Sequence, residues 1–147
     1  MDAQLDRLDE QNDVREANAA FLSQRLRNIR GLTLPDEDAR ITKHGHFLYL
    51  LRIVTDAMGV PRETFVAAMN AENIPLSAGY TPLHKSEMLC SEGFLKATGR
   101  RIDYKSVSLP NTELLCETGM WLSGQILLAP RADVEKIAEA FEKLMRN

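Results

Sequence analysis

The sequence predicts an α+β fold, a two-layer sandwich in which helices cover one face of a small, mostly antiparallel sheet. Three observations predict it: the chain begins with a long helical pattern, its most apolar run has the length and composition of a strand, and its last residues return to a helical pattern. The chain has 147 residues, 44% of them apolar, which is enough for one domain with its own hydrophobic core.

Residues 1–30 form the first predicted unit, a long linker helix. Apolar residues recur there with helical spacing, and no glycine or proline interrupts the pattern before Gly31. A helix from about Ala3 to Ile29 would be ~40 Å long at 1.5 Å per residue. Because that length exceeds the width of so small a domain, we expect the N-terminal end of the helix to pack against something other than the core of residues 31–147.

Residues 31–147 form the second predicted unit, the small α+β domain. Its first strand is expected over Leu32–Leu34. The run Phe47–Val54 is nearly continuous in apolar and aromatic residues, which is typical of a central strand. Because proline is favoured at the first position of a helix, we expect a helix from Pro61 to about Glu72, followed by a strand over Ile74–Leu76.

The second half of this domain has a weaker pattern. Glycines and prolines punctuate Ser77–Pro110, which we expect to be mostly loop with a short helix near Ser86–Leu95. A capped helix is expected from Asn111 to about Leu122, then a strand over Gln125–Ala129 and an amphipathic helix over Asp133–Met145. The residues of this last helix that should face the core are Val134, Ile137, Ala138, Phe141 and Leu144.

Charge and composition exclude several classes of protein. With 18 Lys and Arg against 21 Asp and Glu, the formal charge is −3, so we expect neither nucleic acid nor a membrane as a partner. The basic pair Arg100–Arg101 lacks the interleaved aromatic residues of a nucleic-acid site. No apolar run reaches the ~18 residues of a membrane span, and residues 1–20 lack the apolar core of a secretory signal. Cys90 and Cys116 form no CxxC motif, which favours the reducing cytoplasm.

Metal and nucleophile motifs are equally sparse. His44 and His46 would share a face of a strand, but a zinc site needs about three or four ligands, and we expect no metal. There is no GxSxG motif and no phosphate-binding glycine loop, so we expect no catalytic residue of these classes. An unrelated α+β enzyme that uses these two histidines together with His84 is retained as the least favoured alternative.

The loop Gly79–His84 is the strongest candidate for a binding site. It places the phenol of Tyr80 and the imidazole of His84 on backbone stiffened by Pro82, and both groups can bind a ligand or move a proton. In the alternative interpretation Tyr80 simply packs its ring and His84 satisfies a nearby carbonyl. We take Tyr80 and His84 as candidate substrate-binding residues.

Several segments of the chain, taken in order, match one known family. They are the helical region from Gln4 to Leu26, the strand Phe47–Arg52, the turn Glu72–Pro75, the loop Gly79–His84, and the closing segment from Trp121 to Lys143. Together these segments resemble the C-terminal small domain of the DegT/DnrJ/StrS family of pyridoxal-phosphate-dependent aminotransferases, which often act on keto-sugars and cyclitols. Asn73 stands where the family has a glycine, and asparagine tolerates the left-handed conformation.

The resemblance implies a domain without the chemical centre of the enzyme. Transamination needs a lysine that forms a Schiff base with the cofactor, and in the family that lysine precedes the linker helix. The lysines of this chain lack the glycine-rich stretch that follows it there; they are Lys43, Lys85, Lys96, Lys105, Lys136 and Lys143. We therefore expect no bound cofactor and no activity from this chain alone, although the parent enzyme would use pyridoxal phosphate.

The same resemblance implies the partners of the domain. The large cofactor-binding domain of the parent enzyme would be one, and a second copy, joined through the N-terminal helix, would be the other. An alternative is a free-standing binding or regulatory module that has the same fold and binds a sugar-like ligand or a separate large domain. Its contacts would be the Tyr80–His84 loop and the long helix.

Overall fold

The computed structural model describes residues 5–36, 38–99 and 103–145, and it contains a four-stranded antiparallel sheet. The strand order is β1-β2-β4-β3, with β1 at Leu32–Thr33, β2 at Leu48–Ile53, β3 at Leu76–Ala78 and β4 at Gly119–Ser123. The predicted α+β class and the antiparallel pairing are confirmed. The strand predicted from the apolar run Phe47–Val54 is confirmed as β2, an inner strand of the sheet.

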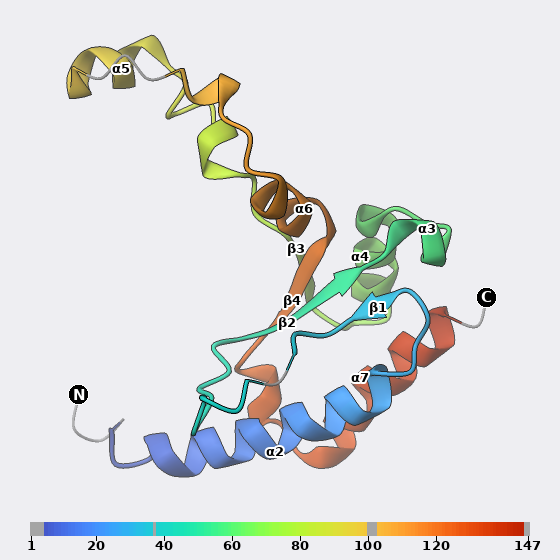
Figure 1. The fold of residues 1–147 in the computed structure, drawn as a ribbon. Coiled ribbons are helices and arrows are strands. Elements are labelled where there is room, and N and C mark those ends of the chain that lie inside the picture. The colour runs from blue at the N-terminus through green and yellow to red at the C-terminus, as the bar shows by residue number, and fades with distance from the viewer. Residues whose placement is uncertain (1–4, 37, 100–102, 146–147) are drawn as a thin grey trace.

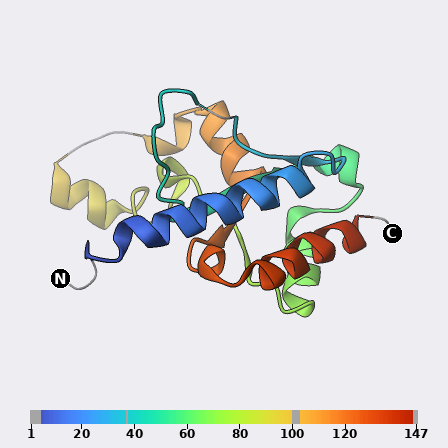
Figure 2. The same ribbon diagram turned by 90° about the horizontal axis from the view of Figure 1, so that it is seen from below.

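Three helices cover one face of this sheet: α2 at Leu8–Leu26, α4 at Arg62–Ala71 and α7 at Arg131–Leu144. Figure 1 shows α2 and α7 below the strands, and Figure 2, seen from below, shows the two helices side by side. The short helix α3, Thr55–Met58, lies in the turn that follows β2. The prediction of helices on one face of the sheet is confirmed.

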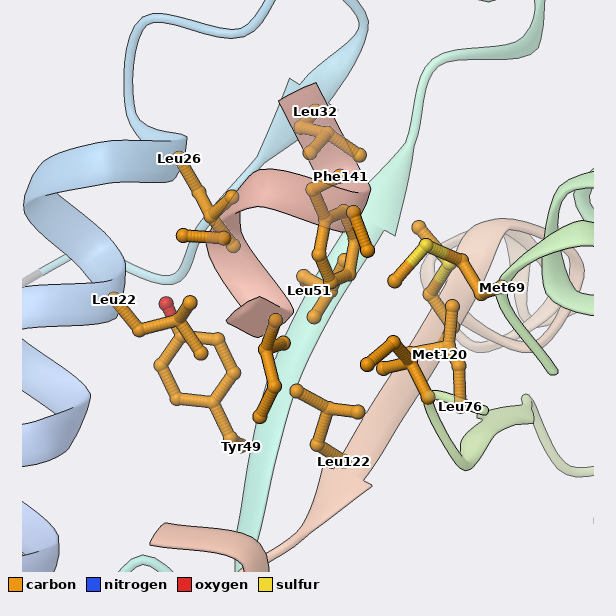
Figure 3. Packing of buried hydrophobic residues seen from close by; sticks show 14 of the residues in the cluster. Leu22, Leu26, Leu32, Tyr49, Leu51, Met69, Leu76, Met120, Leu122 and Phe141 are labelled. Carbon is orange, nitrogen blue, oxygen red and sulfur yellow. The ribbon is translucent and has the colours of Figure 1, made fainter. Parts of the chain in front are cut away.

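The core lies between these helices and the inner face of the sheet. Strand residues alternate, so every second side chain of β2 and β4 points toward the helices. Figure 3 shows this packing, in which the ring of Phe141 stands among leucines and methionines and lies 5.7 Å from the ring of Phe65. The fully buried side chains include Leu22, Leu26, Leu51, Ile53, Met69, Met120, Leu122, Leu127, Val134 and Phe141.

The amphipathic helix predicted at the C-terminus is confirmed as α7. Val134, Ile137, Ala138 and Phe141 are buried as expected, and Leu144 packs against the core from its edge. The N-terminal helix is also confirmed, but it is shorter than expected. It runs from Leu8 to Leu26, and the predicted start at Ala3 lies outside the described residues.

Only the C-terminal half of α2 is buried in this structure. Its buried residues begin at Asn18, whereas Leu5, Leu8 and Val14 are 60%, 44% and 40% exposed. The first part of α2 extends past the sheet in both ribbon views (Figures 1 and 2). The expectation that this end does not pack on the domain's own core agrees with that arrangement.

The segment between β3 and the next helix forms a projecting arm, which we define as residues 80–99 and 103–109. It contains two short 3-10 turns, η1 at Leu83–Lys85 and η2 at Tyr104–Ser106, and the helix α5 at Glu92–Thr98. The helix lies several residues after the predicted Ser86–Leu95, because the Ser91 hydroxyl accepts the Phe94 N–H at 3.2 Å and caps its start. Figure 1 shows α5 far from the sheet. The Arg100–Arg101 pair lies outside the described residues.

The prediction for residues 111–129 is wrong in one respect. Helix α6, Pro110–Thr118, ends before Leu122, and the strand is β4, whereas the predicted strand Gln125–Ala129 is a 3-10 turn, η3, at Ile126–Leu128. The chain becomes extended at Gly119, and a Cβ atom there would stand 2.4 Å from the carbonyl oxygen of Leu115, so this close approach requires glycine. From that residue the side chains alternate in the manner of a strand.

Candidate functional site

The face of the sheet opposite the helices is largely uncovered. Leu50 of β2, Trp121 of β4 and Ser77 of β3 are paired across the strands, so their side chains form one row on this face. Leu50 is 50% exposed although β2 is an inner strand. At one end of this face Arg52, two residues after Leu50, donates to the Thr118 hydroxyl of the helix that precedes β4 at 3.0 Å, and the row beside it forms the base of the candidate site.

Tyr80 covers part of this row. Its ring stacks on that of Trp121, with the ring centroids 4.5 Å apart and the planes inclined by 27°. The other face of Tyr80 remains free, because the residue is 68% exposed. A phenol held in place by a second aromatic ring and open to solvent can stack on a ligand and exchange a hydrogen bond with it.

Local packing explains why Tyr80 lies there. A Cβ atom on the preceding Gly79 would stand 2.7 Å from the carbonyl oxygen of Cys116, so only glycine permits the chain to pass so close to α6. The guanidinium of Arg62 donates hydrogen bonds to the carbonyl oxygens of Cys116 and Gly119 and fixes the end of α6 beside it. Together these contacts direct the start of the arm over β4.

His84 lies in a different environment, at the base of the arm. It is only 6% exposed, and its Nε2 lies 3.2 Å from Oε1 of Glu113 on α6. Glu113 also accepts the Leu109 N–H at 3.1 Å and pairs with the Lys85 ammonium at 2.7 Å. The Cys90 thiol donates to the His84 carbonyl oxygen at 3.6 Å. This cluster ties the arm to α6.

Electrostatics hold Glu113 in its charged form. The Lys85 ammonium, followed by the Leu109 N–H and His84, lowers the pKa of Glu113 to about 2. Glu113 is therefore ionised at neutral pH and can only accept hydrogen bonds, so the Nε2 of His84 carries the hydrogen. The hydrogen on Nε2 of His84 is thus bound by Glu113 within the protein.

The two residues predicted from the Gly79–His84 loop therefore do not form one open pair. Tyr80 is exposed on the sheet face, whereas His84 is buried and paired with Glu113. The sequence analysis placed Trp121 only in the closing segment that resembles the family, and it predicted neither Trp121 nor Glu113 as a site residue. The single tryptophan of the chain was a signal for the first, but nothing local in the sequence connects Glu113 with a histidine 29 positions before it.

The described lysines lie in ion pairs. Five lysine side chains are described, and each lies in an ion pair with a carboxylate at 2.7–3.7 Å: Lys43, Lys85, Lys96, Lys136 and Lys143. Hydrogen bonding to carboxylates raises the pKa of Lys43 and Lys136, which disfavours the neutral amine that attacks a carbonyl. In the described part of the chain these five lysines are thus engaged with carboxylates on the protein surface.

The described residues contain neither a metal-binding cluster nor a helix that could span a membrane. His44 and His46 stack on each other with ring centroids 4.1 Å apart, but no group of three or more His, Cys, Asp or Glu that could hold a metal ion occurs there. Within those same ranges, no helix is long and apolar enough to cross a membrane.

Comparison with known sequences gives a consistent result. Residues 1–142 match the DegT/DnrJ/EryC1/StrS aminotransferase family. The chain is 31% identical to the L-glutamine:2-deoxy-scyllo-inosose aminotransferase of Streptoalloteichus tenebrarius over 98% of its own length and 35% of the relative. It is 27% identical to the 3-amino-5-hydroxybenzoate synthase of Amycolatopsis mediterranei, over 93% of this chain and 34% of that one.

Solved structures show the same relationship. The fold superposes on a crystal structure of 3-amino-5-hydroxybenzoic acid synthase with a TM-score of 0.72 and 27% identity, over 97% of this chain and 37% of that one. An aminotransferase from Psychrobacter cryohalolentis matches with a TM-score of 0.76 at 18% identity, over 99% of this chain and 37% of that chain, and supports the fold alone. The chain thus spans roughly a third of the length of the proteins that it matches, at their C-terminal end.

Proposed function

Because the chain belongs to the DegT/DnrJ/EryC1/StrS aminotransferase family, we propose that it serves as the C-terminal small domain of a pyridoxal-phosphate-dependent aminotransferase that acts on a keto-sugar or a cyclitol. In this proposal a large domain holds the cofactor, and this chain covers the cleft in which the amino acceptor binds. Pyridoxal phosphate, when bound, supplies the electron sink for amino transfer. Without the large domain the chain transfers no amino group.

The uncovered face of the sheet is the observation that carries this proposal. Leu50, Trp121 and Tyr80 leave apolar and aromatic surface open on one side of the sheet, while the other side is buried under three helices. An antiparallel sheet in a free-standing domain can have one solvated face, but polar residues then usually occupy it. Exposed apolar and aromatic side chains such as Leu50 and Tyr80 on that face are expected where another domain packs.

Within this arrangement Tyr80 and His84 have separate tasks. Tyr80 is the candidate substrate-binding residue, because its phenol is exposed and its ring is held by Trp121. His84 is a positioning residue, because it acts through Glu113 to hold the base of the arm against α6. The chain itself supplies binding surface and exclusion of water, and we assign no catalytic residue to it.

The proposal extends to assembly and location. The exposed apolar residues of the first part of α2, Leu5, Leu8 and Val14, favour packing against the large domain or a second copy. The two cysteines, Cys90 and Cys116, are free thiols, which is in keeping with a reducing cytoplasm. We propose a cytoplasmic enzyme whose subunits associate through this helix.

One experiment tests the dependence on a large domain. The chain is incubated with pyridoxal phosphate, reduced with borohydride and examined by mass spectrometry, with peptide mapping of every lysine. We expect no stoichiometric adduct and no turnover of a keto-cyclitol with glutamine as donor. A cofactor absorbance band together with full labelling of one lysine would show that the chain holds its own Schiff base, and the proposal would then be wrong.

A hybrid enzyme tests the role of the uncovered face. Residues 1–142 replace the matching C-terminal third of the Streptoalloteichus tenebrarius aminotransferase. In the hybrid, Tyr80→Ala should raise KM for the keto acceptor more than Tyr80→Phe, because only alanine removes the ring that stacks on Trp121. Met88→Ala, at another exposed position of the arm, is the control. Equal KM values for Tyr80→Ala and the control would show that Tyr80 does not bind the keto acceptor.

A further inference from the structure

Arg52 of β2 is the one charged side chain among the described strand residues that face the uncovered side of the sheet. It stands two positions after Leu50, ~7 Å along the strand, and therefore lies on the same side of β2 as Leu50. The residue is half-buried, although its partner across β4 is Gly119, which has no side chain. A single positive charge thus borders an apolar and aromatic surface.

The hydroxyl of Thr118 fixes the direction of this charge. Nε of Arg52 donates to Oγ1 of Thr118 at 3.0 Å, and the same hydroxyl donates to the Leu114 carbonyl oxygen at 2.7 Å. Thr118 is buried, so the two hydrogen bonds in series hold Arg52 against the last turn of α6. Because a guanidinium is planar and rigid, fixing one of its nitrogens also orients the other two.

The two terminal nitrogens of Arg52 have no hydrogen-bond or ion-pair partner among the residues that the structure describes. The end of α6 does not need them, because Arg62 already donates to the carbonyl oxygens of Cys116 and Gly119 there. Capping of α6 therefore accounts for one of the three nitrogens of Arg52. The other two form an open fork of parallel donors, the arrangement that binds a carboxylate through both of its oxygens.

The surface beside this fork has the composition of a protein interface. Leu50 and Trp121 are paired across the strands, and the ring of Tyr80 stacks on that of Trp121. Tryptophan, tyrosine and arginine are the residue types that contribute most binding energy at interfaces between proteins. The combination of Trp121, Tyr80 and Arg52 on one face therefore favours a folded partner over a small ligand.

A partner that covers this face would remove Arg52 from water. A buried guanidinium without an acceptor is strongly destabilising, whereas pairing with a carboxylate offsets much of the desolvation and fixes the orientation of both groups. The covering surface is therefore expected to bring an acceptor to the open fork. A carboxylate matches the fork best, because its two oxygens meet two parallel N–H donors.

Charge favours a large domain over a second copy as this partner. The described strand residues of the uncovered face include Arg52 but no carboxylate, so two such faces packed on each other would bring like charges together. The chain corresponds to 35–37% of the length of the aminotransferases that it matches. In the proposed function, the remaining part of the parent enzyme includes the domain that can supply the missing negative charge.

We propose that the large domain of the parent enzyme places a carboxylate side chain against Arg52, and that this ion pair sets the position of the small domain over the cleft. The inference rests on the proposed function, because it needs the large domain. The carboxylate binds the two terminal nitrogens, while Thr118 holds the third. Arg52 on β2 and Tyr80 after β3 lie on opposite sides of β4, so the ion pair also fixes where Tyr80 meets the cleft.

A zero-length cross-link tests for the carboxylate. In the hybrid enzyme described above, Arg52→Lys supplies an amine, and a water-soluble carbodiimide joins an amine to a carboxylate that it contacts. Mass spectrometry of the digest should show a cross-link between position 52 and an Asp or Glu of the large domain. The unaltered hybrid is the control, because a guanidinium does not couple. No cross-link at position 52, or one that reaches only residues of this chain, would overturn the proposal.

Thermal unfolding compares the isolated chain with the hybrid. Arg52→Met keeps an apolar stem and removes the charge, so it should change the Tm of the isolated chain little. In the hybrid it leaves a buried carboxylate unpaired, and the Tm should fall by about 5 °C more than in the isolated chain. Arg30→Met, at an exposed position outside the uncovered face, is the matched control and should shift both proteins equally. Equal shifts for Arg52→Met in both proteins would contradict the ion pair.

Three further outcomes separate this inference from the proposed function. If the hybrid is active and Arg52→Met raises only the KM for the amino donor, without a change in Tm, the guanidinium binds substrate and the ion pair between domains is absent. If Arg52→Met alters self-association of the isolated chain in sedimentation equilibrium, a second copy covers the face instead. A folded hybrid that transfers no amino group would overturn the proposed function and this inference with it.

Discussion

The side-chain amide of Asn18 donates a hydrogen bond to the carbonyl oxygen of Leu127 at 2.7 Å, across 109 positions of sequence. The same amide donates to the carbonyl oxygen of Ala129 at 3.0 Å. Asn18 is only 4% exposed, and Leu127 is fully buried. This polar contact within the apolar core joins α2 to the 3-10 turn η3, so the linker helix and the sheet domain share one packed unit over this region.

Asn18→Leu should lower the free energy of unfolding by about 1–3 kcal/mol, because it keeps a side chain of similar size but removes the donor from the buried Leu127 carbonyl oxygen and the partly buried Ala129 carbonyl oxygen. Urea denaturation followed by circular dichroism measures the change. Gln24→Ala, at an exposed position of the same helix, should stay within about 0.5 kcal/mol. If the two variants are equally stable, Asn18 does not hold η3 in place.

The stacked pair Tyr80–Trp121 gives a spectroscopic prediction. Trp121 is the single tryptophan of the chain, so the tryptophan emission comes from this site alone. Tyr80→Ala should shift the emission to longer wavelength and lower the free energy of unfolding by about 0.5–1.5 kcal/mol. Tyr80→Phe keeps the ring and should retain the emission of the unaltered chain. An unchanged spectrum in Tyr80→Ala would show that the rings do not stack in solution.

The elements that were predicted correctly are those whose own residues show a clear hydrophobic pattern. Helix α7 has an apolar face with a period of 3.6 residues, and β2 has an apolar run of strand length, so short-range physics suffices for both. The error over residues 111–129 has a long-range cause. The apolar run Gln125–Ala129 contains a 3-10 turn, and Asn18 donates hydrogen bonds to the carbonyl oxygens of Leu127 and Ala129. Local sequence does not predict a contact with a residue more than 100 positions away.

Sequence predicted only part of the candidate site. The loop Gly79–His84 was found because glycine and proline set its backbone, but the exposure of Tyr80 and the burial of His84 follow from β4 and α6. The alternative interpretation, in which Tyr80 packs its ring and His84 satisfies a neighbour, describes their contacts well, although the neighbour of His84 is the carboxylate of Glu113. The role of Tyr80 toward a substrate stays a prediction.

The Glu113 cluster predicts a dependence of stability on acid pH. The folded-state pKa of Glu113, about 2, lies below its ordinary value of 4.5, so the charged form stabilises the fold above about pH 4.5 and this contribution is lost as pH falls toward 2. The stability difference between the unaltered chain and Glu113→Gln should therefore shrink between pH 5 and pH 2.5, measured by urea denaturation. Glu117→Gln, at an exposed position on the same helix, is the control.

The exposed end of α2 makes a prediction about assembly. Leu8 and Val14 are 44% and 40% exposed on a helix whose other half is packed in the core, and burial of such side chains contributes ~1.5–3 kcal/mol each. The isolated chain should therefore self-associate at micromolar to millimolar concentration, and the double variant Leu8→Glu/Val14→Glu should shift sedimentation equilibrium toward the monomer.

Added negative charge alone could also drive subunits apart, and a second double variant separates the two causes. Gln11→Glu/Gln24→Glu adds the same charge to the same helix at polar positions and removes no apolar surface. We expect it to associate like the unaltered chain, because the attraction comes from Leu8 and Val14. If both double variants dissociate equally, electrostatic repulsion explains the result. If the unaltered chain is a monomer at every concentration, the exposed end of α2 does not pack on a second copy. The large domain then remains its expected partner.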